Sequence, residues 1–388
     1  MQNVFIVGAK NLGNYGGYET FVDKLTEYHK ENEKIKYHVA IKDKEYGEFE
    51  KNNARCFKIK VPNIGPAQAI YYDVKALSEC CKYIKEHNID NPIVYILACR
   101  IGPFAKHFRK KIHKLGGRLY INPDGHEWMR AKWSAPVRKY WKISEKMMVK
   151  QADLLICDSK NIEKYIKETY SQYNPETTFI AYGADIKKSI LADDDKKVTD
   201  WFKEKEVKPK EYYLVVGRFV PENNYETMIR EFMSSNTKKD LVIVTGYQES
   251  KLYPILNNKY HFENDSRIKF VGTIYDDALL KSVRKNAFAY LHGHEVGGTN
   301  PSLLEALGST SLNLLLNVGF NQEVGLDSCI YWGKEKNNLK HLIEHVETFD
   351  QDYIDTLGKA AKERIKNDYS WAKIVSEYEN LFLRKKDL

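Results

Sequence analysis

Short apolar runs alternate along this chain with longer amphipathic segments. In the first half, the runs carry β-branched and aromatic residues, which favour strands, and the segments between them have helical periodicity. Such alternation is typical of β-α-β units in a parallel sheet. The pattern predicts strands at 4–7, 37–41, 56–61, 93–97, 118–121, 154–157 and 178–181, and helices at 20–29, 67–86, 104–115, 137–150 and 161–169.

The alternation stops at residues 185–210, which are rich in charge, and starts again at residue 212. We therefore predict two doubly wound, Rossmann-like α/β domains that face each other across a cleft, with a boundary at 185–186. Ligands are expected at the carboxyl ends of the strands. In the second half the predicted strands are 214–216, 241–245, 268–271, 287–291, 312–316 and 330–332, and the helices are 225–233, 277–285, 301–307 and segments from 340 onward.

The composition fits this division. A chain of 388 residues exceeds what one core usually organises, and 43% hydrophobic with 29% charged residues indicates a folded protein. Six scattered cysteines without metal-ligand spacing indicate free thiols rather than a disulfide framework or a zinc site. No leader peptide and no apolar run long enough to span a bilayer is visible, so a cytoplasmic location is expected.

Positive charge is concentrated in the first half. Residues 1–185 carry 31 basic and 22 acidic side chains, and residues 101–150 alone carry 13 basic and 3 acidic ones among several aromatic residues. Such a surface suits an anionic membrane or a pyrophosphate-bearing lipid. The alternative is an ordinary solvated helix face. Nucleic acid is not expected as a partner, because no nucleic-acid-binding motif accompanies the charge.

A glycine-containing loop follows the first strand, at residues 8–19, and ends in Gly16 and Gly17 before a helix. Glycines let backbone N–H groups approach an anionic ligand at a helix N-terminus. A nicotinamide site is the alternative, supported by Asp43 after the second strand. The loop lacks the G-x-G-x-x-G spacing of such sites.

Arg218 follows the first strand of the second domain, at the carboxyl edge where ligands are expected. Its guanidinium can bind two phosphate oxygens at once, which makes it the best single diphosphate ligand in the chain. A surface ion pair is the alternative interpretation of this arginine.

The most specific motif is the stretch 292–305. Asn300 followed by Pro301 is typical of the N-cap and first residue of a helix. The preceding loop would offer backbone N–H groups to phosphate oxygens through Gly297, Gly298, Thr299 and Asn300. Glu305, one helical turn later, can bind ribose hydroxyls or can instead form a cap or ion pair. Glu295, upstream of the loop, lies where a sugar ring attached to the β-phosphate is expected.

Acidic and imidazole side chains cluster at residues 122–133, after a strand of the first domain. Asp124, His126 and Glu127 could provide general acid–base groups and partners for sugar hydroxyls. Each of them alone could equally be structural.

These motifs together resemble the retaining GT-B glycosyltransferases, and more closely their bacterial rhamnosyltransferase branch, such as the streptococcal capsule enzymes. The resemblance covers nearly the whole chain and rests on residues 15–22, 96–103, 123–133, 217–224 and 292–305. It implies a GT-B fold with an acceptor domain at 1–185, a donor domain at 186–365 and a terminal helix at 366–388 that packs back on the first domain.

The resemblance also implies a reaction. It implies transfer of L-rhamnose from dTDP-β-L-rhamnose to an undecaprenyl-pyrophosphate-linked glucose or N-acetylglucosamine, with a β-1,4 linkage and retention, in capsule or cell-wall polysaccharide synthesis at the inner membrane face. Asn223 stands where the wider family has a diphosphate-binding lysine. Gly16, Gly17, Arg100 and Arg130 are the expected acceptor contacts, while Asp124, His126, Glu127 and Glu295 are the catalytic candidates.

Neither a metal nor any other cofactor is expected, since Arg218 and backbone N–H groups would neutralise the leaving diphosphate. Three alternatives stay open at this point. They are a GT-B transferase with a UDP-hexose or UDP-N-acetylhexosamine donor, an NAD-dependent oxidoreductase, and a non-catalytic sugar-nucleotide sensor.

Overall fold

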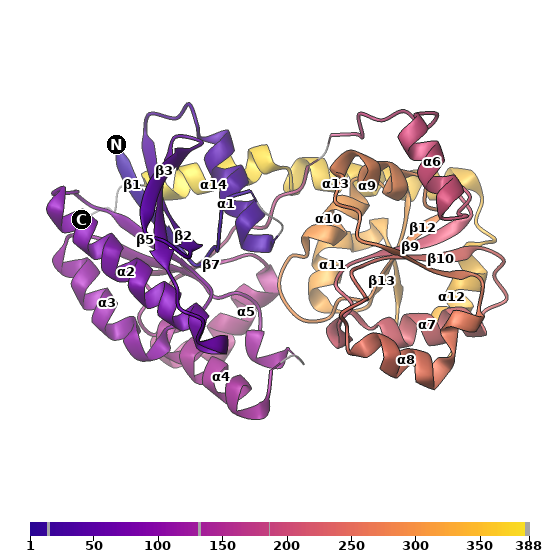
Figure 1. Ribbon diagram of the computed structural model, residues 1–388, viewed down its shortest axis with the longest axis horizontal. Helices are drawn as coiled ribbons and strands as arrows, with labels where there is room; N and C mark the ends of the chain where they lie inside the picture. Colours follow the sequence, from indigo (N-terminus) through magenta and orange to yellow (C-terminus); the bar gives the residue numbers. More distant parts are fainter. Residues whose placement is uncertain (14–15, 131–132, 186, 385–388) are drawn as a thin grey trace. The chain divides into compact units, whose positions relative to one another are not determined.

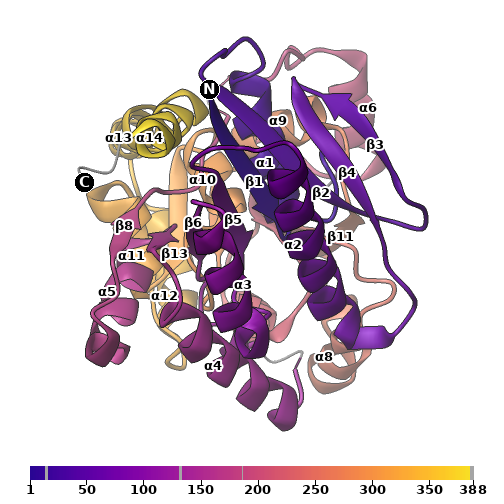
Figure 2. The same ribbon diagram turned by 90° about the vertical axis from the view of Figure 1, so that its left-hand side faces the viewer.

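The protein is represented by a computed structural model that describes residues 1–13, 16–130, 133–185 and 187–384. The chain divides into two compact units. Unit 1 comprises Met1–Gly183 and Trp371–Leu388, and unit 2 comprises Ala184–Ser370. The divisions predicted from the sequence lie at 185–186 and 365–366, within a few residues of these. Each unit is a Rossmann-like α/β domain with a sheet between helices (Figures 1 and 2).

Unit 1 is built on a sheet of eight strands in the order β3-β4-β2-β1-β5-β6-β7-β8. All neighbours are parallel except β3 and β4. The strands are β1 (Gln2–Val7), β2 (Ile35–Asp43), β3 (Gly47–Lys51), β4 (Ala54–Lys60), β5 (Ile93–Leu97), β6 (Arg118–Asn122), β7 (Leu154–Cys157) and β8 (Thr177–Phe179). The helices are α1 (Gly17–Tyr28), α2 (Gln68–Glu86), α3 (Gly102–Lys114), α4 (Ala135–Val149), α5 (Lys160–Thr169) and α14 (Trp371–Leu383).

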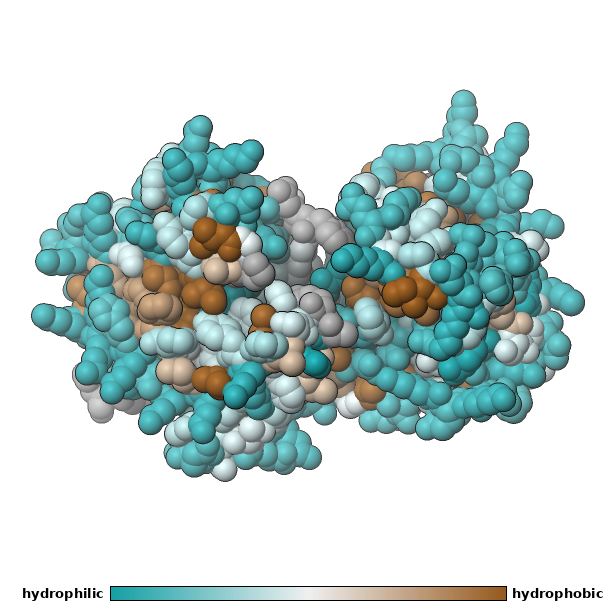
Figure 3. All heavy atoms as spheres, turned by 60° about the horizontal axis from the view of Figure 1, so that its bottom comes forward, coloured by the Kyte–Doolittle hydropathy of each residue, from teal (hydrophilic) through white to brown (hydrophobic). Residues whose placement is uncertain are grey.

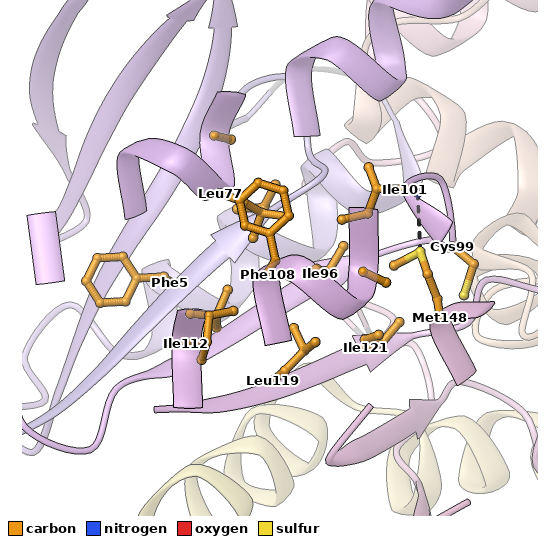
Figure 4. Close-up of a cluster of buried hydrophobic side chains, with 14 of the residues drawn as sticks. Phe5, Leu77, Ile96, Cys99, Ile101, Phe108, Ile112, Leu119, Ile121 and Met148 are labelled. Carbon is orange, nitrogen blue, oxygen red and sulfur yellow. Dashed lines mark hydrogen bonds between the residues drawn. The ribbon is translucent and has the colours of Figure 1, made fainter. Parts of the chain in front are cut away.

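Helices cover both faces of this sheet. Figure 4 shows the core on one face, where side chains of α2 and α3 meet those of the strands, and where the backbone N–H of Ile101 points at Sδ of Met148, 3.3 Å away. On the other face α14 contacts α1 and β1. There the Tyr378 hydroxyl lies 3.1 Å from that of Tyr95, and the ring of Phe382 packs near the same tyrosine.

Unit 2 has six parallel strands in the order β11-β10-β9-β12-β13-β14. Numbered within the unit, this is the 3-2-1-4-5-6 order of dinucleotide-binding folds. The strands are β9 (Tyr212–Val216), β10 (Asp240–Val244), β11 (Ile268–Gly272), β12 (Ala289–His292), β13 (Leu312–Leu316) and β14 (Ile330–Trp332). The helices are α6 (Lys196–Glu204), α7 (Tyr225–Ser234), α8 (Leu252–Tyr260), α9 (Asp277–Lys285), α10 (Pro301–Leu307), α11 (Gly319–Gly325), α12 (Asn338–Val346) and α13 (Gln351–Asp368).

The prediction that residues 185–210 only interrupt the pattern was wrong. This stretch contains α6, which starts at the N-cap Asp195 and buries Val198, Trp201 and Phe202 against the sheet of unit 2. These apolar residues have helical spacing, but the surrounding lysines and aspartates hid the signal. The predictions also omitted β3, α8 and α11.

Candidate functional site

The site in unit 2 forms where the sheet topology reverses. β9 and β12 are hydrogen-bonded parallel neighbours, and successive strands lead away from them toward opposite edges of the sheet. Loops that leave two such strands separate and leave room for a ligand at their carboxyl ends. Arg218 follows β9, and the 292–305 motif begins at the end of β12. The topology therefore brings both predicted phosphate-binding segments to one place.

Three hydrogen bonds join these two loops. Asn223 Oδ1 lies 2.7 Å from His294 Nδ1, and the Asn224 side chain donates to the Gly293 carbonyl at 2.8 Å. The Glu295 backbone N–H also donates to the Glu222 carbonyl at 3.0 Å. The loop that carries Arg218 and the loop that leads to Gly297 are thus one connected structure.

Arg218 itself is exposed, and among the described residues it has no ion-pair partner. The alternative of a surface ion pair is therefore not what the structure shows. An exposed guanidinium at the carboxyl edge of the sheet is available to an anionic ligand.

The predicted helix start after the loop is confirmed. Oδ1 of Asn300 accepts from the backbone N–H groups of Ser302 at 2.9 Å and Leu303 at 3.3 Å, with Pro301 as the first helical residue. The Ser302 hydroxyl donates to the Val216 carbonyl at 3.0 Å, which fixes the start of α10 against the end of β9. Gly297 has a φ of 139°, a conformation that favours glycine. Gly298 and the buried Thr299 complete the loop.

Both predicted glutamates of this site form ion pairs. Glu305 Oε2 lies 2.6 Å from the guanidinium of Arg284, whose side chain is only 2% exposed. This is the ion-pair alternative considered for Glu305, and it holds the carboxylate in place without excluding a ligand from its other oxygen. Glu295 pairs with Lys334, which follows β14.

The side chain of Asn223 is used within the protein. Besides the contact with His294, its Nδ2 donates to the Arg218 carbonyl at 2.7 Å. Both polar atoms are thus occupied, and the asparagine positions the Arg218 loop. His292, at the end of β12, is buried, and burial together with nearby His294 lowers its pKa to about 3. It is therefore neutral at physiological pH.

Unit 1 contains a cavity of about 340 Å³ at the carboxyl edge of its own sheet. β1 and β5 are neighbours there, and the loops that follow them diverge. Arg100, Asp124 and Glu127, which were predicted from the sequence, line this cavity. The other lining residues are Gly8, Lys10, Lys42, Gly65, Gln68, Ala69, Tyr72, Ala98, Cys99, Pro123, Trp128, Trp133, Trp141 and Glu145.

The acidic residues of the cavity are held by basic and aromatic neighbours. Glu127 pairs with Arg130 at 2.6 Å and accepts from the Trp133 indole N–H at 2.8 Å. Arg130 also lies 3.9 Å from Asp124. The predicted Arg130 therefore supports the cavity wall, although it does not line the cavity itself.

Arg100 is fixed in the cavity wall by a buried carboxylate. Its guanidinium donates to the Gly8 carbonyl at 3.1 Å and lies 3.4 Å from Asp73, which is fully buried. Burial raises the pKa of Asp73 to about 6, and Arg100 opposes that rise. The pair orients Arg100 between the ends of β1 and β5.

Besides Arg130, three predicted residues lie outside the cavity lining. His126 packs on the ring of Tyr165 with the ring centroids 4.2 Å apart, and burial lowers its pKa. Gly16 is the N-cap of α1, and the Gly17 carbonyl accepts from the Tyr182 hydroxyl at 2.8 Å. The motif residues Tyr15, Ala131 and Lys132 lie outside the described residues.

Sequence analysis missed several cavity residues, notably Lys42, Trp141 and Glu145. Lys42 lies near the end of β2, a position that could have marked it. Trp141 and Glu145 lie within α4, where helical spacing indicates only packing. Asp43, the residue that supported a nicotinamide site, pairs with Lys58 at 2.8 Å.

No group of three or more metal-ligating side chains occurs within the described residues. Among the helices of the described ranges, none is both long and apolar enough to span a bilayer.

The chain is similar to known proteins in sequence and in fold. Residues 1–185 match the model of a domain of unknown function, DUF1972. The uncharacterized glycosyltransferase MJ1069 of Methanocaldococcus jannaschii is 25% identical over an alignment of 397 positions that covers 96% of each chain. Sucrose-phosphate synthase from Thermosynechococcus elongatus superposes with a TM-score of 0.79 at 17% identity, over 98% of both chains.

A further solved structure has a nucleotide bound. Alr3699/HepE of Anabaena, in complex with UDP, superposes with a TM-score of 0.68 at 13% identity, over 98% of this chain and 99% of that one. The fold is GT-B. At these identities the structural likeness establishes the arrangement of helices and strands and leaves the reaction to the site residues.

Proposed function

We propose that this protein is a glycosyltransferase with a nucleotide-sugar donor, and that it transfers L-rhamnose from dTDP-β-L-rhamnose to a lipid-pyrophosphate-linked glucose or N-acetylglucosamine. The linkage would be β-1,4, formed with retention, in capsule or cell-wall polysaccharide synthesis. The observation that carries this proposal is the junction in unit 2 between the Arg218 loop and the loop of Gly297, Gly298 and Thr299. The relative named a glycosyltransferase and the fold shared with a UDP complex support it.

In this proposal the donor diphosphate lies between the Arg218 guanidinium and the backbone N–H groups of residues 297–300. As the glycosidic bond breaks, negative charge grows on the leaving diphosphate, and these donors bind the growing charge more strongly than the ground state. The same groups would do the work of a divalent cation, so we propose a metal-independent reaction. Because α10 has only seven residues, the guanidinium is assigned the larger part of the stabilisation.

The two glutamates would orient the donor. Glu305, held by the buried Arg284, would bind the ribose hydroxyls with its remaining oxygen. Glu295, paired with Lys334, would contact the transferred sugar. The ion pairs fix the direction of each carboxylate before the donor arrives, which reduces the entropy lost on binding.

The acceptor sugar is assigned to the cavity of unit 1. Arg100, Asp124 and Glu127 line it, and Arg130 supports it. Gly16 and Gly17 would border the acceptor from the start of α1.

The lipid of the acceptor would lie along α3 and α4, which pack together. These helices expose the apolar side chains of Phe104, Ile143 and Met147. Exposed lysines of the same helices include Lys110, Lys111, Lys139 and Lys146. Figure 3 shows apolar patches on unit 1 surrounded by hydrophilic side chains. Together they suit a peripheral contact with an anionic membrane on its cytoplasmic face.

The direct test is a donor panel. The protein is incubated with dTDP-β-L-rhamnose, UDP-glucose, UDP-galactose or UDP-N-acetylglucosamine and with synthetic lipid-pyrophosphate-linked glucose or N-acetylglucosamine, and products are identified by mass spectrometry. A rhamnosylated product with the dTDP donor alone is expected, and Arg218→Ala should lose it. Transfer only from a UDP sugar would contradict rhamnose as the transferred sugar and would identify that UDP sugar as the donor. Thermal stabilisation by NAD without any transfer would indicate an oxidoreductase instead.

Membrane contact is tested separately with vesicles that contain phosphatidylglycerol. Replacement of Lys110, Lys111 and Lys139 by glutamine should weaken binding, because each basic residue near an anionic surface adds about 1 kcal/mol. Arg109 is left unchanged, since it pairs with Asp153 at 3.2 Å. The matched control replaces Lys196, Lys203 and Lys208 of unit 2. Equal vesicle binding by both triple variants would remove α3 and α4 as the membrane surface.

A further inference from the structure

Glu145 of α4 is a buried carboxylate in the wall of the unit 1 cavity, and its side chain is only 5% exposed. One of its oxygens is surrounded by donors. Oε1 accepts from the Tyr165 hydroxyl at 2.5 Å and also from the hydroxyl of Tyr170. Lys142 lies 3.5 Å from the same oxygen. Three donors on one oxygen fix the carboxylate and balance its charge.

The lysine of this cluster is itself held by aromatic rings. Its Nζ lies 4.2 Å from the ring centroid of Trp128 and 4.8 Å from that of Tyr165. A cation over aromatic faces is stabilised by their quadrupoles and keeps its position. Glu145 therefore belongs to a rigid group of side chains that anchors one oxygen and leaves the other for a separate contact.

The second oxygen has no such partner. Oε2 accepts no hydrogen bond from any described residue. It is also not fully enclosed by protein atoms. Oε2 therefore keeps accessible surface, in a side chain that is otherwise buried and lines the cavity. A hydroxyl that entered the cavity would donate to this accessible oxygen, and a hydrogen bond to a charged acceptor is about twice as strong as one between neutral groups.

The rest of the cavity indicates what kind of molecule carries that hydroxyl. Trp128, Trp133 and Trp141 line it together with Asp124 and Glu127. Indole faces pack against the C–H faces of a pyranose, while carboxylates accept from its hydroxyls. A volume of about 340 Å³ lies at the lower end of the range for small-ligand sites, which suits one sugar ring rather than a disaccharide.

We propose that Glu145 is a specificity-determining residue of this protein, which accepts a hydrogen bond from a ring hydroxyl of the acceptor sugar through Oε2 while Tyr165, Tyr170 and Lys142 hold Oε1. The inference rests on the proposed function, since it assigns the cavity to the acceptor. To the proposed function it adds the residue that recognises the acceptor, Glu145. It also adds the ligand class, a single pyranose with a free hydroxyl that reaches Glu145 of α4.

The test measures sugar binding without the donor. Quenching of tryptophan fluorescence reports on the cavity, because three tryptophans line it. The probes are methyl β-D-glucopyranoside and N-acetylglucosamine, with dTDP as a nucleotide competitor. Glu145→Gln should weaken sugar binding about tenfold or more, as expected for the loss of a charged hydrogen bond. Tyr170→Phe removes a donor from Oε1 only and should change the Kd less than threefold.

A second readout separates this inference from the proposed function. Slow hydrolysis of dTDP-rhamnose by the wild-type protein in the absence of acceptor tests the donor part of the proposed function by itself. In the complete reaction Glu145→Gln should raise the KM for the lipid-linked acceptor and leave the KM for the donor unchanged. Sugar binding that persists in a protein with no transfer or hydrolysis would contradict the proposed function and leave the Glu145 contact standing.

If Glu145→Gln does not fold, Glu145→Asp keeps the negative charge for Lys142 and draws the carboxylate back from the cavity by one methylene. It should weaken sugar binding in the same direction. Wild-type sugar affinity and acceptor KM in whichever variant folds would overturn the proposal. Quenching by dTDP, with no response to either sugar, would overturn it as well.

Discussion

Oδ1 of Asn223 lies 2.7 Å from Nδ1 of His294, although the two residues are 71 positions apart in the chain. The contact joins the loop after β9 to the loop after β12, so the direction of Arg218 depends on a residue of the other segment. We expect Asn223→Ala to lower kcat/KM for the donor about tenfold and the free energy of unfolding by about 1 kcal/mol. Donor-dependent kinetics and urea unfolding measure the two effects. The control, Asn236→Ala, removes an exposed amide that contacts Glu344 and should leave the kinetics unchanged.

Gly293 allows the same two loops to approach closely. A Cβ at this position would lie 2.4 Å from the Asn223 carbonyl oxygen, a distance that the backbone must relieve by moving. Gly293→Ala should therefore cost about 1–3 kcal/mol of stability and weaken nucleotide binding. The matched control is Gly308→Ala, whose Cβ would meet nothing closer than 3.4 Å. Equal melting temperatures and equal dTDP affinities for the two variants would show that the two loops do not need to approach each other so closely.

Glu305 is the counter-ion of a buried positive charge. Its carboxylate is 41% exposed, but the Arg284 side chain that it pairs with is only 2% exposed. Glu305→Gln leaves that guanidinium without a counter-ion, so we expect a loss of about 1–2 kcal/mol, reduced from the buried-pair range by solvent screening. The double variant Glu305→Gln with Arg284→Met should recover stability without recovering donor binding. Recovery of both properties would show that Glu305 has only a structural role.

Acid should destabilise unit 2 through His292. Burial, together with His294, lowers the pKa of His292 from 6.5 to about 3 in the folded protein. As the pH falls below 6.5 the unfolded chain takes up this proton first, so the stabilisation present above 6.5 is lost progressively toward pH 3. The loss amounts to about 2 kcal/mol by pH 5. Urea unfolding of wild type and His292→Leu at pH 7 and pH 5 measures it. A variant that loses as much stability as wild type between these pH values would contradict the assignment.

The pattern of apolar residues along the chain was sufficient to predict the bounds of strands that are buried on both faces. β5, β7 and β13 begin and end where their apolar runs predict, because water is excluded along the whole strand. β3 was missed because it is a short edge strand with exposed, mostly polar residues. α6 was missed because charged residues surround its three buried apolar positions.

The site was predictable only in part, for a related reason. Arg218 follows β9 and the loop that ends in the Asn300 N-cap follows β12, so parallel topology brings the two segments to one edge of the sheet. The role of Glu145 depends on tyrosines from the region of α5 that approach it only in the folded unit. No spacing along the sequence records such a contact. The same holds for Arg284, which lies at the end of α9 and meets Glu305 of α10.

The return of α14 to unit 1 has a consequence for synthesis. During translation the ribosome releases residues 1–183 long before residues 371–383, which supply Tyr378 and Phe382 to the face of the sheet around Tyr95. Unit 1 must therefore wait, with an apolar face uncovered, while all of unit 2 emerges. Domains commonly fold in order of emergence. Here the second unit can close its core first, and the nascent first unit is the one that would need a chaperone.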